Sequence, residues 1–152
     1  MSIQSLTAVV FASLLISADL LAAGSSSSSG ASTQGDNYSL AVKAVKNENY
    51  NHALRLLNKV VAKSPANADA WNYLGFSHRK LKNYAQALTA YNKALAIDPD
   101  HLGANEYLGE LYVQTGKLDQ AQTHLNKLKS LCGTGCEEYQ DLNRAIQTGR
   151  AG

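Results

Sequence analysis

The chain has 152 residues, of which 45% are hydrophobic and 17% are charged, so it can form one globular domain or a short repeat array. Its formal net charge is +2, and its Lys and Arg residues are spread along the sequence rather than clustered. This balance argues against a nucleic-acid partner, because such proteins concentrate basic residues on one surface.

Residues 1–23 have the order of a signal peptide. An apolar run from Leu6 to Ile16 is followed by small residues that end at Ala23, where a peptidase can cut. The alternative is an uncleaved anchor. It is disfavoured by Asp19 and by the shortness of the run, since a membrane span needs about 20 apolar residues. We therefore expect a periplasmic or secreted protein that meets the membrane only during export.

Residues 24–35 are rich in Ser and Gly and contain no large apolar side chain. Such a segment cannot offset the entropy lost on ordering. The sequence therefore predicts a flexible linker ahead of the folded part.

From residue 36 onward the sequence repeats with a period of 34 residues. Three copies cover residues 36–66, 67–100 and 101–133, and each holds two amphipathic runs with helical spacing. Ala53, Ala87 and Ala121 recur at this period, as do Leu40, Leu74 and Leu108. Two helices per 34-residue unit are typical of a helical repeat array.

The same spacing predicts which side chains face the core. On the first helix of each copy, one stripe carries Leu40, Leu74 and Leu108 beside Ala41, Gly75 and Gly109, and the second helix of the third copy presents Leu118, Ala121, Leu125 and Leu128. A glycine inside a helix costs up to about 1 kcal/mol relative to alanine. We expect Gly75 and Gly109 to face Ala87 and Ala121, so that the two helices of a hairpin approach closely, with Trp71, Tyr84 and Tyr91 filling the space between copies.

The second copy carries a motif of seven residues: Trp71, Leu74, Gly75, Ala87, Tyr91, Ala94 and Pro99. This motif resembles the tetratricopeptide repeat, and the three copies extend the resemblance over residues 36–133. The resemblance implies an all-α fold, a right-handed superhelix of three helix hairpins whose first helices line a concave, peptide-binding groove. The Cys-x3-Cys-Glu-Glu-Tyr segment from Cys132 to Tyr139 looks like the tail of small exported bacterial proteins of this repeat class.

Residues 134–148 predict a capping helix over the last hairpin. Tyr139, Leu142 and Ile146 form one apolar stripe. The acids Glu137 and Glu138 lie in the first turn, where the helix dipole favours negative charge, so they need no catalytic explanation.

Cys132 and Cys136 are the two cysteines of the chain, and a Gly-rich loop separates them. In an oxidising compartment such a pair favours a disulfide. Two alternatives remain open. Cys136 would begin a helix, which lowers a thiol pKa and suits redox chemistry, or the two sulfurs could hold Cu(I), or Zn with help from His124. We expect the structural disulfide and no resident metal or cofactor.

Finally, the first helices present a second face, about 100° from the core stripe, that would line the concave groove. It carries Tyr38, Val42, Val45, Asn72, Phe76, Arg79, Glu106, Glu110 and Val113. This mixed surface predicts a ligand segment with apolar side chains and a Lys or Arg near Glu106 and Glu110. The alternative is that Phe76 and the valines pack between repeats. Val42, Tyr73 and Tyr107 replace the residues with which some family members clamp chaperone C-termini, which makes that partner class doubtful.

No phosphate loop, serine elbow or metal-spaced histidine motif is present, so we predict no enzymatic activity. The sequence favours a binding scaffold in the cell envelope with a peptide or protein segment as its partner. A thiol redox or copper-handling protein that uses Cys132 and Cys136 is the alternative, and self-association through the groove is a further possibility.

Overall fold

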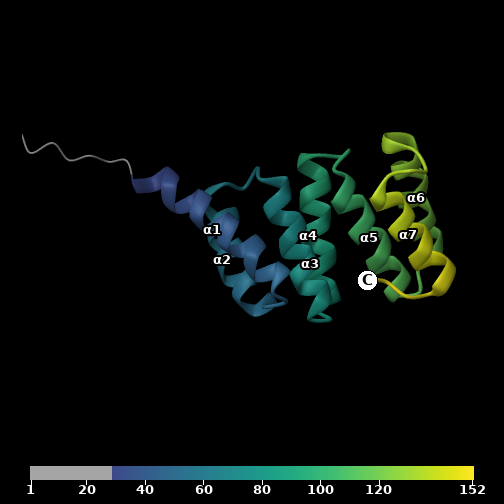
Figure 1. Ribbon diagram of the computed structural model, residues 1–152, viewed down its shortest axis with the longest axis horizontal. Helices are drawn as coiled ribbons and strands as arrows, with labels where there is room; N and C mark the ends of the chain where they lie inside the picture. Colours follow the sequence, from purple (N-terminus) through teal and green to yellow (C-terminus); the bar gives the residue numbers. More distant parts are fainter. Residues whose placement is uncertain (1–28) are drawn as a thin grey trace, which may run out of the picture.

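The computed structural model describes residues 29–152, and the side chains from residue 36 onward. Seven helices lie side by side along the molecule: α1 (Ser29–Lys46), α2 (Tyr50–Lys63), α3 (Ala68–Lys80), α4 (Tyr84–Ile97), α5 (Leu102–Gln114), α6 (Leu118–Cys132) and α7 (Glu137–Thr148) (Figure 1). The described residues contain no strand, and the fold is the all-α hairpin superhelix that the sequence predicts. The expected signal peptide lies outside them.

The helices pair as three hairpins, α1 with α2, α3 with α4 and α5 with α6, and α7 packs against both α5 and α6. The first helices also contact one another in order, α1 with α3 and α3 with α5. Together with α7 they form one layer of the array, so residues distant in sequence meet on a common face. Among the described residues, none of the helices combines the length and apolarity that crossing a membrane requires.

Each hairpin turn has the same backbone conformation at the same repeat position. Glu48, Lys82 and Gly116 stand 34 residues apart and have φ values of 56°, 62° and 73°. This left-handed conformation is strained for residues other than Gly. Its recurrence at Glu48 and Lys82 means that the packing of the hairpin, rather than local preference, sets the turn.

Polar side chains begin the first helices of the second and third hairpins. Asn67 accepts a hydrogen bond from the Ala70 N–H at 2.9 Å, and His101 Nδ1 accepts one from the Ala104 N–H at 3.2 Å. Each satisfies a backbone donor that the first helical turn leaves unpaired. These caps fix where α3 and α5 start, and so fix which of their side chains share a face.

Two corrections concern the glycines in the helix interiors. A Cβ on Gly75 would lie 2.5 Å from the ring of Tyr91, and a Cβ on Gly109 would collide with the side chain of Leu142 on α7. These neighbours, rather than the expected Ala87 and Ala121, are the closest ones. Gly75 therefore makes room for a buried aromatic ring, and Gly109 makes room for the capping helix.

Two leucines expected in the core are half exposed. Leu40 and Leu118 each keep 50% of their surface accessible. Leu74 and Leu108, at the position equivalent to Leu40, pack against the preceding hairpin, but no hairpin precedes α1 among the described residues. Leu118 is equivalent to Tyr84, which packs against the hairpin that follows it, and α6 is followed only by α7.

The start of α1 also differs from the expectation. The helix begins at Ser29, so its backbone includes residues 29–35 of the predicted flexible linker. Residues 24–28 of that linker lie outside the described part of the chain.

Candidate functional site

A cleft of about 340 Å³ lies on the layer formed by α1, α3, α5 and α7. We call it the acidic cleft because carboxylates line it on three helices and no Lys or Arg does. Its lining residues are Tyr38, Asp69, Asn72, Tyr73, His101, Gly103, Glu106, Tyr107, Glu137, Glu138 and Asp141.

Three of the nine predicted groove residues line this cleft: Tyr38, Asn72 and Glu106. The ring of Tyr38 meets that of Tyr73 edge to face, with 6.2 Å between the ring centroids. Burial, and secondarily the negative charge of Asp69, raises the pKa of Tyr38 to about 12. The hydroxyl therefore stays protonated at neutral pH and is available as a hydrogen-bond donor.

Val45 and Val113 are core residues, which contradicts their assignment to the groove. Val45 belongs to the apolar cluster of the first two hairpins, and Val113 packs in the cluster that α7 closes. For these two the alternative of packing between repeats is the correct one. Val42 and Phe76 are partly buried, and Phe76 lies against the ring of Tyr107 at a centroid distance of 4.9 Å.

Arg79 and Glu110 form a buried ion pair with 2.6 Å between nitrogen and oxygen, and they are 2% and 4% exposed. The segment after α7 folds back over them beside α5 (Figure 1). There Arg79 donates a hydrogen bond to the Gly152 carbonyl at 3.0 Å, and the Gly152 N–H donates one to Glu110 at 2.9 Å. The cation expected in the groove is thus neutralised and covered, so the accessible surface is acidic rather than mixed.

Glu106 is the most perturbed carboxyl group of the cleft. It is 8% exposed, and desolvation raises its pKa from 4.5 to about 8, with further contributions from the negative charges of Glu110, Asp141 and Glu138. The Arg79 guanidinium acts in the opposite direction. Glu106 is therefore protonated for much of the time at neutral pH, and a cation placed nearby would lower its pKa and favour release of the proton to solvent.

The sequence interpretation missed most of the acids of the cleft. Asp69 pairs with His101 at 3.0 Å, and Asp141 pairs with Arg144 at 3.0 Å. Glu138 and Asp141 stand three residues apart, so they share one side of α7. That spacing could have indicated an acidic surface on α7. The sequence interpretation attributed the acids at the start of this helix to the helix dipole and predicted no site there.

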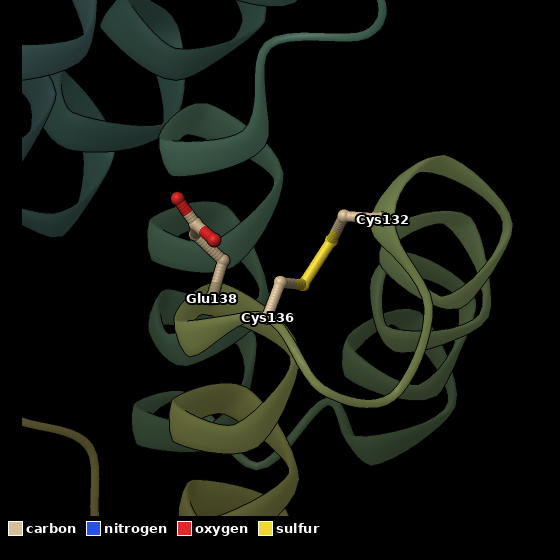
Figure 2. Close-up of side chains that lie close together, drawn as sticks. All are labelled: Cys132, Cys136 and Glu138. Atoms are coloured by element: carbon tan, nitrogen blue, oxygen red, sulfur yellow. A yellow bond between two sulfur atoms is a disulfide. The ribbon is translucent and has the colours of Figure 1, made fainter.

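The Sγ atoms of Cys132 and Cys136 lie 2.06 Å apart, the distance of a disulfide bond, and join the end of α6 to the start of α7 (Figure 2). Among the described residues, one group could hold a metal ion, and it consists of this pair with Glu138. His124 does not join it. Its Nδ1 bonds the side-chain oxygen of Asn105 at 3.0 Å, and its ring stacks on Tyr112.

Comparison with known proteins agrees with the fold. Two family profiles, both described as tetratricopeptide repeat, match residues 68–101 and 90–123. The chain therefore contains tetratricopeptide repeats, and its fold is the superhelix of helix hairpins that they build. No curated protein sequence matches the chain.

Solved structures share this fold. MamA from Desulfovibrio magneticus RS-1 is 28% identical, with a TM-score of 0.60 over 62% of this chain and 54% of that one. SycD, the type III secretion chaperone of Yersinia enterocolitica, in complex with a peptide of the translocator YopD, is 19% identical, with a TM-score of 0.67 over 78% and 89%. The first TPR of Spaghetti (RPAP3), bound to the HSP90 peptide SRMEEVD, is 20% identical, with a TM-score of 0.69 over 77% and 92%.

Proposed function

We propose that this chain is a non-enzymatic scaffold that binds a peptide or protein segment on its concave face. The acidic cleft is the observation that carries the proposal, because it is a built recess shared by several helices. Tyr73 and Tyr107 line it and offer flat, partly apolar surface with a polar tip, the kind of side chain that protein interfaces use. The SycD and Spaghetti structures, each with a bound peptide, support this kind of partner.

The proposal places the scaffold in the cell envelope, in the periplasm or outside the cell. It rests on the apolar run and small residues of positions 1–23. The intact mass of the protein recovered from separated cell fractions tests it. A mass lacking about 23 residues in the periplasmic or secreted fraction is the expected result, and a full-length chain in the cytoplasm would contradict it.

Site-specific crosslinking tests the scaffold. A photo-reactive amino acid is placed at Glu138, on the acidic cleft, and in a matched variant at Asp119, an exposed acid on α6. We expect an adduct of defined mass from the cleft position only. The partner that this adduct identifies, once purified, should crosslink to the purified chain at the same position. Equal adducts from both positions would sink the assignment. An adduct of twice the mass of the chain would identify the partner as a second copy.

A thiol redox or copper-handling function is the second candidate, and the group of Cys132, Cys136 and Glu138 favours it. Such a protein must open the Cys132–Cys136 bond to work. We expect instead that the bond is structural. The five-residue ring closed between the two cysteines should then stabilise the fold by about 2 kcal/mol through the entropy of the unfolded chain.

Changing Cys132→Ser with Cys136→Ser distinguishes the two functions. A structural bond predicts a lower denaturant midpoint with unchanged crosslinking at Glu138. Ready exchange of the native cysteine pair with glutathione would support a redox function. Cu(I) binding by the reduced protein but not by the serine variant would support a copper-handling function.

A further inference from the structure

Two largely buried polar side chains line the acidic cleft, and the fold leaves the oxygen of one of them without a partner. Asn72 on α3 is 5% exposed, and its side-chain oxygen has no hydrogen-bond partner. Glu106 on α5 is 8% exposed, forms none of the ion pairs among the described residues, and lines the cleft with oxygens that are not among the fully buried unpaired atoms. Leaving a polar atom such as the Asn72 oxygen buried and unpaired is costly, and most buried polar atoms of native structures have a partner.

The two groups come from neighbouring helices and line the same recess. The amide of Asn72 can turn about its last side-chain bond, which exchanges its oxygen and nitrogen and lets it present an acceptor to the cleft. A ligand that meets the Glu106 carboxylate, and the Asn72 oxygen when that amide has turned toward the cleft, must therefore donate hydrogen bonds. Because one acceptor is a carboxylate, a positively charged donor completes the pair best.

The carboxylates around these two groups favour a cation as well. Glu137 and Glu138 lie at the rim on α7, and neither forms an ion pair among the described residues. Arg79 is buried and does not line the cleft, and its charge is already matched by Glu110. The cleft thus carries a negative charge that its own residues do not neutralise.

The spacing of the acids selects the kind of cation. In the part of the chain that the structure describes, the carboxylates of the cleft do not converge closely enough to surround a metal ion, since the one convergent group is the cysteine pair with Glu138. Acceptor groups spread over a recess of about 340 Å³ suit a longer organic cation. The rings of Tyr73 and Tyr107 can flank its aliphatic stem, and a ring face attracts the charged end.

We propose that the acidic cleft binds the side chain of a Lys or Arg of a partner segment, with Asn72 and Glu106 as the acceptors of its charged end. This inference rests on the proposed scaffold function and names the chemistry of the segment that the scaffold takes. The partner is a basic segment of a protein, recognised by its charged end and its stem together.

The probe for the test is hexalysine, acetylated at its N-terminus and amidated at its C-terminus. Its control is the same peptide with every lysine carbamylated, which keeps the stem and removes the charge. We expect calorimetry at low salt to show hexalysine binding at least about tenfold more tightly than the control, since an isolated charged hydrogen bond supports roughly that discrimination. Equal binding of the two peptides would overturn the proposal.

Variants localise the binding. At pH 9, where Glu106 is largely ionised, Glu106→Gln should weaken hexalysine binding by about tenfold or more, whereas Asp119→Asn, which removes one carboxylate from an exposed site on α6, should leave it unchanged. Equal effects of the two variants would mean attraction to net charge only and would overturn the site. If Glu106→Gln does not fold, the rim variant Glu137→Gln with Glu138→Gln takes its place with the same expectation.

Two further outcomes separate this inference from the scaffold itself. If Ca²⁺ or Mg²⁺ alone displaces hexalysine with an affinity that falls in Glu106→Gln, the cleft is a metal site and the inference fails. If crosslinking at Glu138 finds a partner but hexalysine does not bind, the scaffold stands and the inference fails. Hexalysine binding at Glu106 without a crosslinked partner supports the cation site and contradicts the scaffold.

Discussion

Burial and charge conflict most directly at Glu106. The side chain is held on α5 by the packing of that helix between α3 and α7, while Glu110, Asp141 and Glu138 add negative charge around it. The conflict is relieved when the group takes up a proton or meets a cation. Its protonation therefore links the stability of the fold to pH.

Glu106 should make the protein less stable as the pH rises. Its pKa is raised from 4.5 to about 8 on folding, so between these values the folded state binds a proton that the unfolded state has released. The free energy of unfolding falls over that window, and Glu106→Gln should remove roughly 2–4 kcal/mol of the fall. Urea unfolding at pH 5 and pH 9 checks this.

Comparing wild type with Glu106→Gln isolates the contribution of Glu106 to the pH dependence of stability. Burial lowers the pKa of His78 and of His124, so these groups cost stability as the pH falls through their ordinary value, the opposite sense. Both are present in wild type and variant and cancel in the difference. Parallel pH curves for the two proteins would contradict the assignment.

Arg79 and Glu110 form a buried ion pair. Arg79→Met leaves Glu110 buried without its cation and should cost about 3–5 kcal/mol. Adding Glu110→Met removes the stranded charge and should restore most of that loss, because apolar side chains of similar volume often replace a buried pair at little cost. Denaturant unfolding of both variants measures this, and a double variant no more stable than Arg79→Met would refute it.

At the scale of elements, the contact of α5 with α7 decides how the acidic cleft is built. Gly109 lacks the side chain that would collide with Leu142, and this lets α7 settle onto α5. The disulfide from Cys132 to Cys136 holds the start of the same helix. Both contacts lie beside the part of α7 that brings Glu138 and Asp141 to the cleft.

Gly109→Ala should destabilise the protein, although alanine is the better helix former by about 1 kcal/mol. The added methyl group overpacks the contact with Leu142, and we expect a net loss of about 1–3 kcal/mol. Gly135→Ala is the matched control, because a Cβ there meets no atom within 4 Å. Thermal unfolding compares them. In a protein that already carries Leu142→Ala, adding Gly109→Ala should no longer destabilise the fold by overpacking.

At the scale of the whole molecule, α7 both covers the last hairpin and contributes residues to the acidic cleft. Leu142 is fully buried in the cluster that also holds Val113 and Leu128. A repeat array needs such a cover, because each hairpin buries its apolar face only against a neighbour. The same helix therefore covers the last hairpin and lines the cleft.

Leu142→Asp should undock α7. A charge placed in that apolar cluster has no partner, so the last hairpin should expose its apolar side and the protein should self-associate. Gln140→Asp, on the exposed side of the same helix, is the control and should stay as dispersed as wild type. Light scattering and binding of an apolar dye measure the difference. A well-dispersed Leu142→Asp protein would show that α7 is dispensable as a cover.

The sequence by itself determined the helices, their pairing and the repeat. Small residues such as Ala87 and large ones such as Tyr91 follow helical spacing, and residues three or four apart in sequence share one face of a helix. Tyr38, Asn72 and Glu106 of the cleft also followed from this periodicity. The tertiary structure decided the rest of the site.

The position of α7 brings its acids to α3 and α5, and that position depends on the contact of Gly109 with Leu142, which no periodicity encodes. The fold also removed Arg79 from the accessible surface. Its partners Glu110 and Gly152 meet it only after the chain has turned back on itself. Helical pattern is a property of neighbours in sequence, whereas the charge of a cleft is the sum over elements that meet only on folding.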